Sequence, residues 1–175
     1  MRIVALDPSL TATGVADSAR PAPWTISYPR LQGEARLHAI HKHVIAVTQG
    51  ADLVVIEGYA YAEGARAHSM GELGGLIRVG LWARNIPKVE IPPANMKKVA
   101  TGNGGAKKEA VLAEAIRRLG YKGSNNNETD ALWLLQCGLI HYGLAGAPEL
   151  PKKHLEGLEK VQWPSIEELE KRRTA

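Results

Sequence analysis

Residues 3–16 read IVALDPSLTATGVA, which is two short apolar runs on either side of a turn. The first run ends in Asp7, and Pro8 and Ser9 are typical turn residues, so the pattern predicts a β-hairpin. Residues 24–28 alternate large and polar side chains between two prolines, which predicts a third strand. The chain is therefore expected to begin with three antiparallel strands.

Beyond this start, the spacing of apolar residues alternates between helical and strand-like. It predicts helices over 31–48, 69–84, 106–119 and 128–142, and strands over 53–56 and 89–91. Prolines at 92 and 93 are expected to end the last strand. Three strands followed by alternating helices and strands are typical of a mixed α/β domain and depart from a purely parallel alternation.

Length and composition fit one such domain followed by a different C-terminal segment. The chain has 175 residues, of which 45% are hydrophobic and 23% charged, ordinary values for a globular protein. We expect the domain to span residues 1–143. Residues 144–175 carry six basic and six acidic side chains and three prolines, without a strong apolar face. They are expected to form a peripheral tail.

The sequence also indicates a compartment. The N-terminal apolar run over 3–6 is too short for a signal peptide, and no apolar stretch approaches the roughly 18 residues of a membrane helix. The single cysteine, Cys137, excludes an internal disulfide and a cysteine-rich zinc module, and its apolar neighbours indicate core packing. We therefore expect a soluble cytoplasmic protein without a membrane partner, in which oxygen or histidine ligands would hold any catalytic metal.

Basic charge is concentrated in one segment. The whole chain has a net charge of +4, whereas residues 88–122 carry eight basic and only three acidic side chains. The helix expected over 106–119 has apolar residues on one side and basic residues on the other. This segment favours an anionic partner.

Three acidic residues stand at the ends of strongly apolar elements. Asp7 ends the first strand, Glu57 follows LVVI, and Asp130 precedes ALWLL in the first turn of the last helix. A carboxylate at the end of a buried strand is costly unless it is paired or binds a cation, and ligand sites on α/β sheets gather at the C-terminal ends of strands. Each acid alone is most often a turn cap or a partner of a lysine. The three together indicate a site for hard divalent cations.

The segments IVALDPSLTATGVA, LVVIEG and NETDALWLL resemble, in order and spacing, the motifs of the RuvC-type Holliday-junction resolvases in the ribonuclease-H-like superfamily. The resemblance spans residues 1–143. It implies a mixed five-stranded sheet, antiparallel in its first three strands and then parallel, flanked by helices. It also implies a crossover junction endodeoxyribonuclease that binds branched DNA and resolves four-way junctions. Small size and the residues at 9 and 127 resemble phage-encoded members more than chromosomal ones.

The resemblance also implies the chemistry of the site. Asp7 would bridge two Mg²⁺ ions, and Glu57 and Asp130 would each complete one coordination sphere, with Mn²⁺ able to substitute. Such a metal pair activates a water and stabilises the leaving oxygen, and the family's products are a 5′-phosphate and a 3′-hydroxyl. Three carboxylates do not balance two divalent ions, so a fourth ligand is expected in addition to the scissile phosphate.

Two neighbouring residues are candidates for that fourth ligand. The family usually has an acid or a histidine three residues before the last aspartate, and this position is Asn127. Asn127 shares a helical face with Asp130 and would bind through its amide oxygen. Glu128 has the charge and the longer reach, and it could turn inward if Asn127 caps the helix. Glu128 is preferred, and Asn127 stays open.

Four lysines of the basic segment are expected to contact the DNA backbone: Lys97, Lys98, Lys107 and Lys108. Lys97 and Lys108 fall where the family carries such lysines, and the other two lie beside them. Tyr59 and Tyr61 follow in the segment where the family places an aromatic residue near unstacked bases, and they suit packing over the sheet edge equally well.

A homodimer is expected because paired incisions in a two-fold symmetric junction need two sites. The helix over 69–84 carries glycines that suit close packing against a second copy: Gly71, Gly74, Gly75 and Gly80.

Several alternatives stay open at this point. A nuclease of the same fold could act on forks, flaps or RNA in a hybrid, and a non-catalytic junction-binding protein would bind without cutting. The first motif also occurs in actin-like phosphotransferases, but no Walker A sequence is present and no nucleotide cofactor is expected. The spacing of His38, His41 and His43 differs from that of a zinc motif, which favours a surface position for them.

Overall fold

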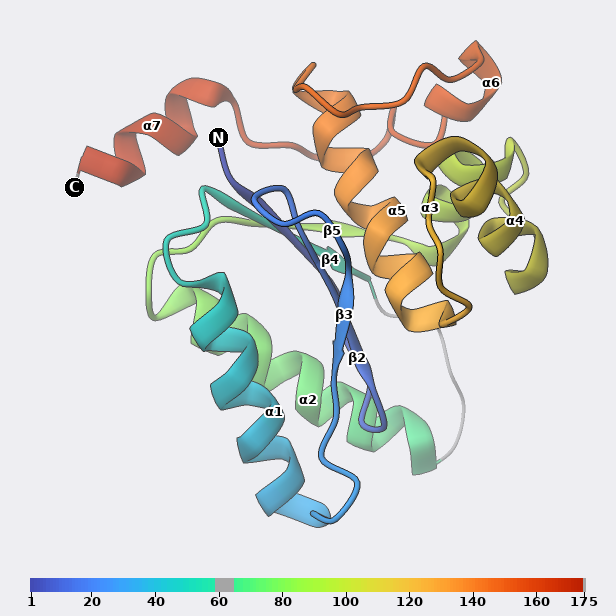
Figure 1. The fold of residues 1–175 in the computed structure, drawn as a ribbon. Coiled ribbons are helices and arrows are strands. Elements are labelled where there is room, and N and C mark those ends of the chain that lie inside the picture. Colours follow the sequence, from blue (N-terminus) through green and yellow to red (C-terminus); the bar gives the residue numbers. More distant parts are fainter. Residues whose placement is uncertain (59–64, 175) are drawn as a thin grey trace.

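In the computed structural model, which describes residues 1–58 and 65–174, five strands form one mixed sheet (Figure 1). The strands are β1 (Ile3–Asp7), β2 (Thr13–Asp17), β3 (Trp24–Ile26), β4 (Leu53–Glu57) and β5 (Lys88–Ile91). Their order across the sheet is β3-β2-β1-β4-β5. The β1–β2 and β2–β3 pairs are antiparallel, whereas the β1–β4 and β4–β5 pairs are parallel. The predicted architecture is confirmed.

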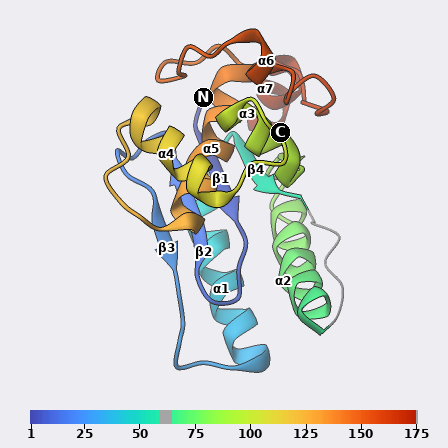
Figure 2. The ribbon, with the colours of Figure 1, turned by 90° about the vertical axis from the view of Figure 1, so that its right-hand side faces the viewer.

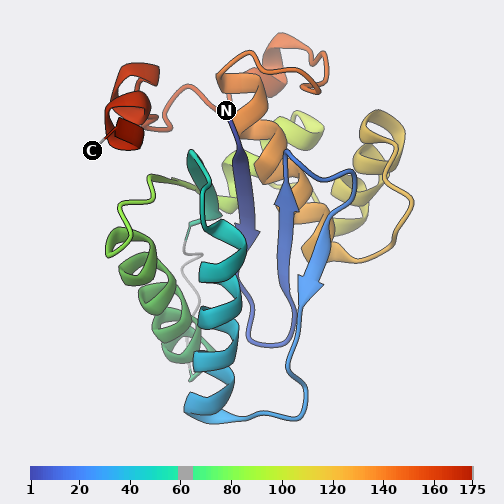
Figure 3. The same cartoon turned by 60° about the vertical axis from the view of Figure 1, so that its left-hand side comes forward.

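Helices cover both faces of this sheet (Figures 1 and 3). They are α1 (Gly33–Thr48), α2 (Ala65–Trp82), α3 (Pro93–Thr101), α4 (Lys108–Leu119), α5 (Asn126–His141), α6 (Lys152–Leu155) and α7 (Ile166–Thr174). The pair α1 and α2 packs on one face, and α5 crosses the other with α3 and α4 beside it. No helix among the described residues is long and apolar enough to span a membrane.

Alternation along the central strands divides the core in two. Ile3 and Ala5 of β1 belong to the cluster under α5, whereas Val4 and Leu6 belong to the cluster under α1 and α2. This follows because successive side chains of a strand point to opposite faces of the sheet. Both faces of β1 and β4 are buried, so these strands are apolar throughout until their last residue.

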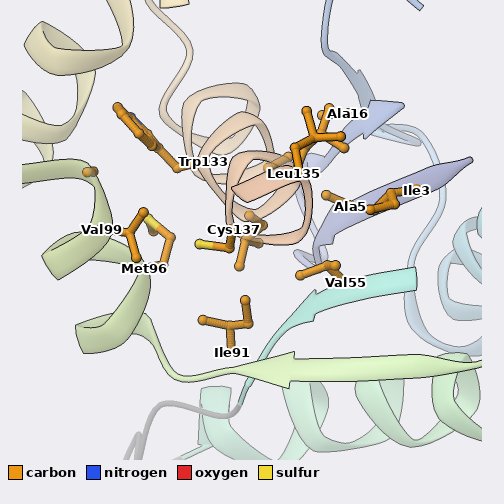
Figure 4. Packing of buried hydrophobic residues seen from close by; sticks show 14 of the residues in the cluster. Ile3, Ala5, Ala16, Val55, Ile91, Met96, Val99, Trp133, Leu135 and Cys137 are labelled. Carbon is orange, nitrogen blue, oxygen red and sulfur yellow. The ribbon is translucent and has the colours of Figure 1, made fainter. Parts of the chain in front are cut away.

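Helix α5 is held rigidly against the sheet. Figure 4 shows Trp133 and Cys137 of α5 packed toward α3 and β5. The indole Nε1 of Trp133 donates a hydrogen bond to the carbonyl of Val111 on α4 at 3.2 Å. Gly138 lets the helix approach the sheet closely, since a Cβ there would lie 3.1 Å from Ile3. The predicted core position of Cys137 is confirmed, because its side chain is fully buried.

Helix α3 was not predicted, because Pro92 and Pro93 were interpreted only as the end of a strand. Pro93 instead occupies the first position of α3. A proline is well suited to that position, since its missing N–H has no partner in a helix and its φ angle is already helical. The helix ends at Gly102, whose φ of 76° is easily adopted by glycine.

The C-terminal segment packs more closely than a peripheral tail. Leu158 and Leu169 are buried in the same cluster as α5, and Val161 and Trp163 pack against its edge. The expectation of a purely peripheral segment is therefore wrong at these positions, because isolated apolar residues pack without forming a continuous apolar face. The boundary at residue 143 stays a prediction.

Candidate active site

The parallel pairing of β1 and β4 brings two of the three acids together. Leu6 pairs with Ile56 in the register of these strands, so the next residues, Asp7 and Glu57, end neighbouring strands at the same edge of the sheet. Asp130 reaches this edge from the first turn of α5, which packs over β1. Figure 2 shows α3, α4 and α5 gathered around β1 and β4 on this side of the molecule.

The three acids are shielded from solvent. Asp7 is 6% exposed and Asp130 is 7% exposed, whereas Glu57 is half-buried. Each follows or precedes a run of apolar residues that must be buried, and the carboxylate is carried to the edge of the core with them. Such carboxylates are costly when ionised and unpaired.

Burial and mutual repulsion raise the pKa values of these acids. Burial, the charge and hydrogen bond of Glu57 and the charge of Asp130 together raise the pKa of Asp7 to about 9. Burial also raises the pKa of Glu57, although its hydrogen bond with Asp7 opposes the rise. The hydrogen bond between the two carboxyl groups raises the pKa of Asp7 and lowers that of Glu57, so it favours a proton on Asp7 that is donated to Glu57.

Two of the four predicted lysines stand beside the acids. The Lys108 Nζ lies 3.7 Å from the Asp130 Oδ2. Burial raises the pKa of Asp130, and the positive charges of Lys108 and Lys97 oppose that rise. Both lysines also act in the same sense on Glu57. The site thus has positive side chains placed to neutralise part of its negative charge.

The other two predicted lysines lie elsewhere. Lys98 forms an ion pair with Glu156 of the C-terminal segment at 2.7 Å. Lys107 is exposed at the N-terminal boundary of α4. Tyr59 and Tyr61 lie outside the described residues.

Both candidates for the fourth ligand have partners outside the acid cluster. The Asn127 Nδ2 donates to the carbonyl of Ala12 at 2.7 Å, which ties α5 to the β1–β2 hairpin. The Glu128 Oε2 accepts a hydrogen bond from the Tyr121 hydroxyl at 2.7 Å. The helix is capped by Asn125, whose side chain accepts from the Asn127 and Glu128 amides. Asn127 is therefore not the cap that would have turned Glu128 inward.

The hydrogen bond between Tyr121 and Glu128 could not be predicted from the sequence. Tyr121 lies seven residues before Glu128 and outside α5, so no helical spacing links the two residues. The cap at Asn125 could have been predicted, since asparagine is a favoured N-cap residue and three asparagines stand directly before Glu128.

The donor set fits a divalent cation. Asp7, Glu57 and Asp130 offer hard oxygen ligands, and a bound cation would stabilise the ionised forms that burial disfavours. Within the described residues, no three His, Cys, Asp or Glu side chains are placed so that together they could hold one metal ion. The hydrogen bond between Asp7 and Glu57 and the ion pair between Lys108 and Asp130 reduce the repulsion among these carboxylates.

Comparison with known proteins shows which sequences this chain is similar to. The chain is 26% identical over 155 residues to "Crossover junction endodeoxyribonuclease RuvC" of Carboxydothermus hydrogenoformans, covering 82% of this chain and 98% of that protein. It is 28% identical over 155 residues to the RuvC of Gloeobacter violaceus, covering 81% and 90%. The sequence is therefore similar to RuvC-type crossover junction endodeoxyribonucleases. No family model matches it.

The fold is similar to that of solved RuvC structures. The structure of Thermus thermophilus RuvC superposes with a TM-score of 0.64 at 23% identity, covering 85% of this chain and 100% of that protein. The structure of T. thermophilus RuvC in complex with Holliday junction substrate gives the same TM-score and identity. The fold is therefore ribonuclease-H-like, as expected. The similar RuvC proteins come from bacteria, and the resemblance to phage-encoded members stays a prediction.

Proposed function

We propose that this chain is a crossover junction endodeoxyribonuclease that resolves four-way DNA junctions in the bacterial cytoplasm. The observation that carries the proposal is the convergence of Asp7, Glu57 and Asp130 at one edge of the sheet, with Lys97 and Lys108 beside them. Buried acids with adjacent bases suit the hydrolysis of a phosphodiester, because the acids hold cations and the bases attract the phosphate.

The three acids have distinct proposed roles. The charges of Glu57 and Asp130 both act on Asp7, which would bridge two Mg²⁺ ions, while Glu57 and Asp130 would each complete one coordination sphere. When bound, such a pair of Mg²⁺ or Mn²⁺ ions activates a water and stabilises the leaving oxygen, which yields 5′-phosphate and 3′-hydroxyl products. To bind a cation, Asp7 would have to be ionised against its raised pKa, and Lys108 would have to loosen its ion pair with Asp130.

The fourth ligand is proposed to be Glu128, with Asn127 as the alternative. Glu128 would have to leave the Tyr121 hydroxyl, whereas Asn127 would keep its bond to Ala12 through Nδ2 and offer its Oδ1. Glu128→Gln and Asn127→Ala separate the two, because only the true ligand should change the concentration of Mg²⁺ needed for half-maximal cleavage. Tyr121→Phe serves as a control that frees Glu128 without removing it.

DNA binding is proposed to centre on the lysines near the acids. Lys97 and Lys108 would contact phosphates next to the scissile bond, since their charges already reach the acid cluster. Lys107 would contact the backbone at the start of α4. Tyr59 and Tyr61 would stack on unstacked bases near the junction centre.

A homodimer is proposed to form through α2. Val79 and Trp82 are 64% and 78% exposed and lie three residues apart, so they form an apolar stripe on one side of the helix with Leu76. Nothing lies within 4 Å of a Cβ built on Gly75, so this side admits a second helix. Gly80 instead faces α1, where a Cβ would collide with His41, so its expected place in the dimer contact is wrong.

Cleavage of a labelled synthetic four-way junction in Mg²⁺ tests the proposal. Asp7→Asn, Glu57→Gln and Asp130→Asn should lose the paired symmetric cuts while still binding the junction in Ca²⁺. Binding without any cutting by the wild-type protein would instead indicate a non-catalytic junction-binding protein. Faster cutting of a fork or a flap than of the junction would assign the same chemistry to another branched substrate.

A further inference from the structure

A short part of the C-terminal segment is fixed on α3, the helix that carries Lys97 and Lys98. Figures 1 and 2 show α6 beside α3. The Asn95 Nδ2 donates to the carbonyl of Gly157 at 2.7 Å, and the His154 Nδ1 donates to the carbonyl of Val99 at 2.8 Å. Both His154 and Gly157 are buried.

The fit between the two elements is close. A Cβ at Gly157 would lie 2.7 Å from the carbonyl oxygen of Asn95 and 2.9 Å from the Val99 side chain. A Cβ at Gly102 would lie 3.1 Å from the His154 ring. Contacts this tight leave α6 in one position on α3, so the side chains that α6 presents to solvent have a defined place beside those of α3.

Two lysines from different elements flank one carboxylate at this contact. The Lys98 Nζ lies 2.7 Å from the Glu156 Oε2, and both side chains are partly exposed. Lys153 precedes Glu156 by three residues in a helical backbone, which places the two on the same side. The hydrogen bond and charge of Lys98 and the charge of Lys153 lower the pKa of Glu156.

Positive side chains lie on three helices, α4, α3 and α6, of which α3 contacts both of the others. Lys108 and Lys97 act on the acid cluster, Lys98 follows Lys97 on α3, and Lys153 follows on α6. A DNA arm that leaves the acids across α3 would therefore meet α6 next. In the described contacts, the acid that lies beside Lys98 and Lys153 is Glu156.

We propose that Lys98 and Lys153 form a second phosphate-binding site, which contacts the backbone of a junction arm, and that Glu156 occupies this site until DNA displaces it. An exposed ion pair is weak enough for a phosphate to compete with the carboxylate. The inference rests on the proposed function, because it requires the protein to bind branched DNA.

The test measures binding of a fluorescent four-way junction in Ca²⁺ over a series of KCl concentrations. Each lysine that contacts a phosphate contributes about 0.9 to the slope of log K against log salt, so Lys98→Gln and Lys153→Gln should each reduce the slope by about that amount. Glu156→Gln should tighten binding about two- to five-fold at low salt and keep the slope. Lys42→Gln is the matched control, since Lys42 is exposed on α1 across the sheet.

Lys153→Gln is the decisive variant, because Lys153 is exposed and its loss leaves the contacts between α3 and α6 intact. The inference is overturned if Lys153→Gln matches Lys42→Gln in affinity and slope while the wild-type protein binds the junction. Weaker binding by Glu156→Gln would overturn the competing role of Glu156 and leave it as a structural contact. Failure of the wild-type protein to bind any branched DNA would overturn the proposed function and this inference together.

Discussion

Asp7 lies where burial and two neighbouring carboxylates act in the same direction. The pKa of this side chain rises from 3.8 to about 9, which favours the protonated form at neutral pH, whereas the proposed metal site needs the carboxylate ionised. Burial of Asp7 at the end of an apolar strand makes its ionisation unfavourable, and a bound cation would offset that free-energy cost. Proton and metal therefore compete for Asp7, which affects both stability and cleavage.

The stability of the fold should depend on the charge of Asp7. The pKa of Asp7 in the folded state lies above the unfolded value of 3.8, so ionisation of Asp7 disfavours the folded state. The resulting loss of folding stability grows as pH rises from about 4 toward 9. Asp7→Asn removes this cost and keeps a donor for Glu57. We expect the variant to be more stable than wild type at pH 8 by on the order of 1–3 kcal/mol, measured by urea unfolding in EDTA. Equal stability of the two proteins at pH 5 and pH 8 would contradict the raised pKa.

The metal dependence of cleavage should vary with pH for the same reason. A protonated Asp7 binds no cation, so Mg²⁺ and protons compete for the site. At subsaturating Mg²⁺ the cleavage rate should rise as pH increases from neutrality toward 9, and saturating Mg²⁺ should move the midpoint of that rise to lower pH. Rate measurements at two Mg²⁺ concentrations across this range provide the check. A midpoint that does not move with Mg²⁺ would show that another group controls the rate.

At the scale of elements, the N-terminal end of α5 decides where Asp130 lies. Asn125 caps the helix, and the side chain of Asn127 bonds to the hairpin between β1 and β2. Gly14 of β2 allows this approach, because a Cβ there would collide with the Asn127 carbonyl. The hairpin that carries Asp7 and the helix that carries Asp130 are therefore held in register by one close contact.

Gly14→Ala should break that contact. The collision involves backbone, so α5 must move away from β2, and we expect a loss of about 1–3 kcal/mol in the free energy of unfolding. Cleavage should fall further than stability explains, since Asp130 moves with the helix. Gly105→Ala is the control, because a Cβ there meets only the Asn103 side chain at 3.5 Å. Chemical denaturation and junction cleavage, measured on the same preparations, test both effects.

At the scale of the whole molecule, the layers place the active site and the apolar stripe of α2 on different elements. The acids lie at the edge formed by β1, β4 and α5, whereas Val79 and Trp82 face outward from α2. A second copy could therefore cover α2 and leave both sets of acids open to one junction. This arrangement suits two symmetric incisions.

Val79→Glu should disrupt this dimer without unfolding the chain, because Val79 is already exposed. Sedimentation at micromolar concentration should change from dimer to monomer, and paired cuts should be replaced by single nicks. Ile166→Glu, a similarly exposed apolar position on α7, should change neither property. A monomeric wild-type protein would exclude the α2 dimer.

Local pattern accounts for most of the fold and for the three acids. The strands, their antiparallel start and four of the helices were predictable, because apolar periodicity and turn residues act over a few neighbours. Asp7, Glu57 and Asp130 could be identified because each stands where an apolar element begins or ends. Helix α3 was missed because a proline that starts a helix was interpreted as a stop, and the short α6 and α7 lie in the segment that was expected to be a tail.

The partners of individual side chains depended on contacts between distant parts of the chain. Lys98 meets Glu156 of the C-terminal segment, Asn127 meets Ala12 across 115 positions, and Glu128 turns to Tyr121 in the preceding loop. The burial of Asp7 also depends on distant parts of the chain. Its pKa is raised because helices and strands that are remote in the sequence pack around it in the fold. Periodicity describes which face of an element is apolar, but the choice of partner follows from how the folded layers pack against one another.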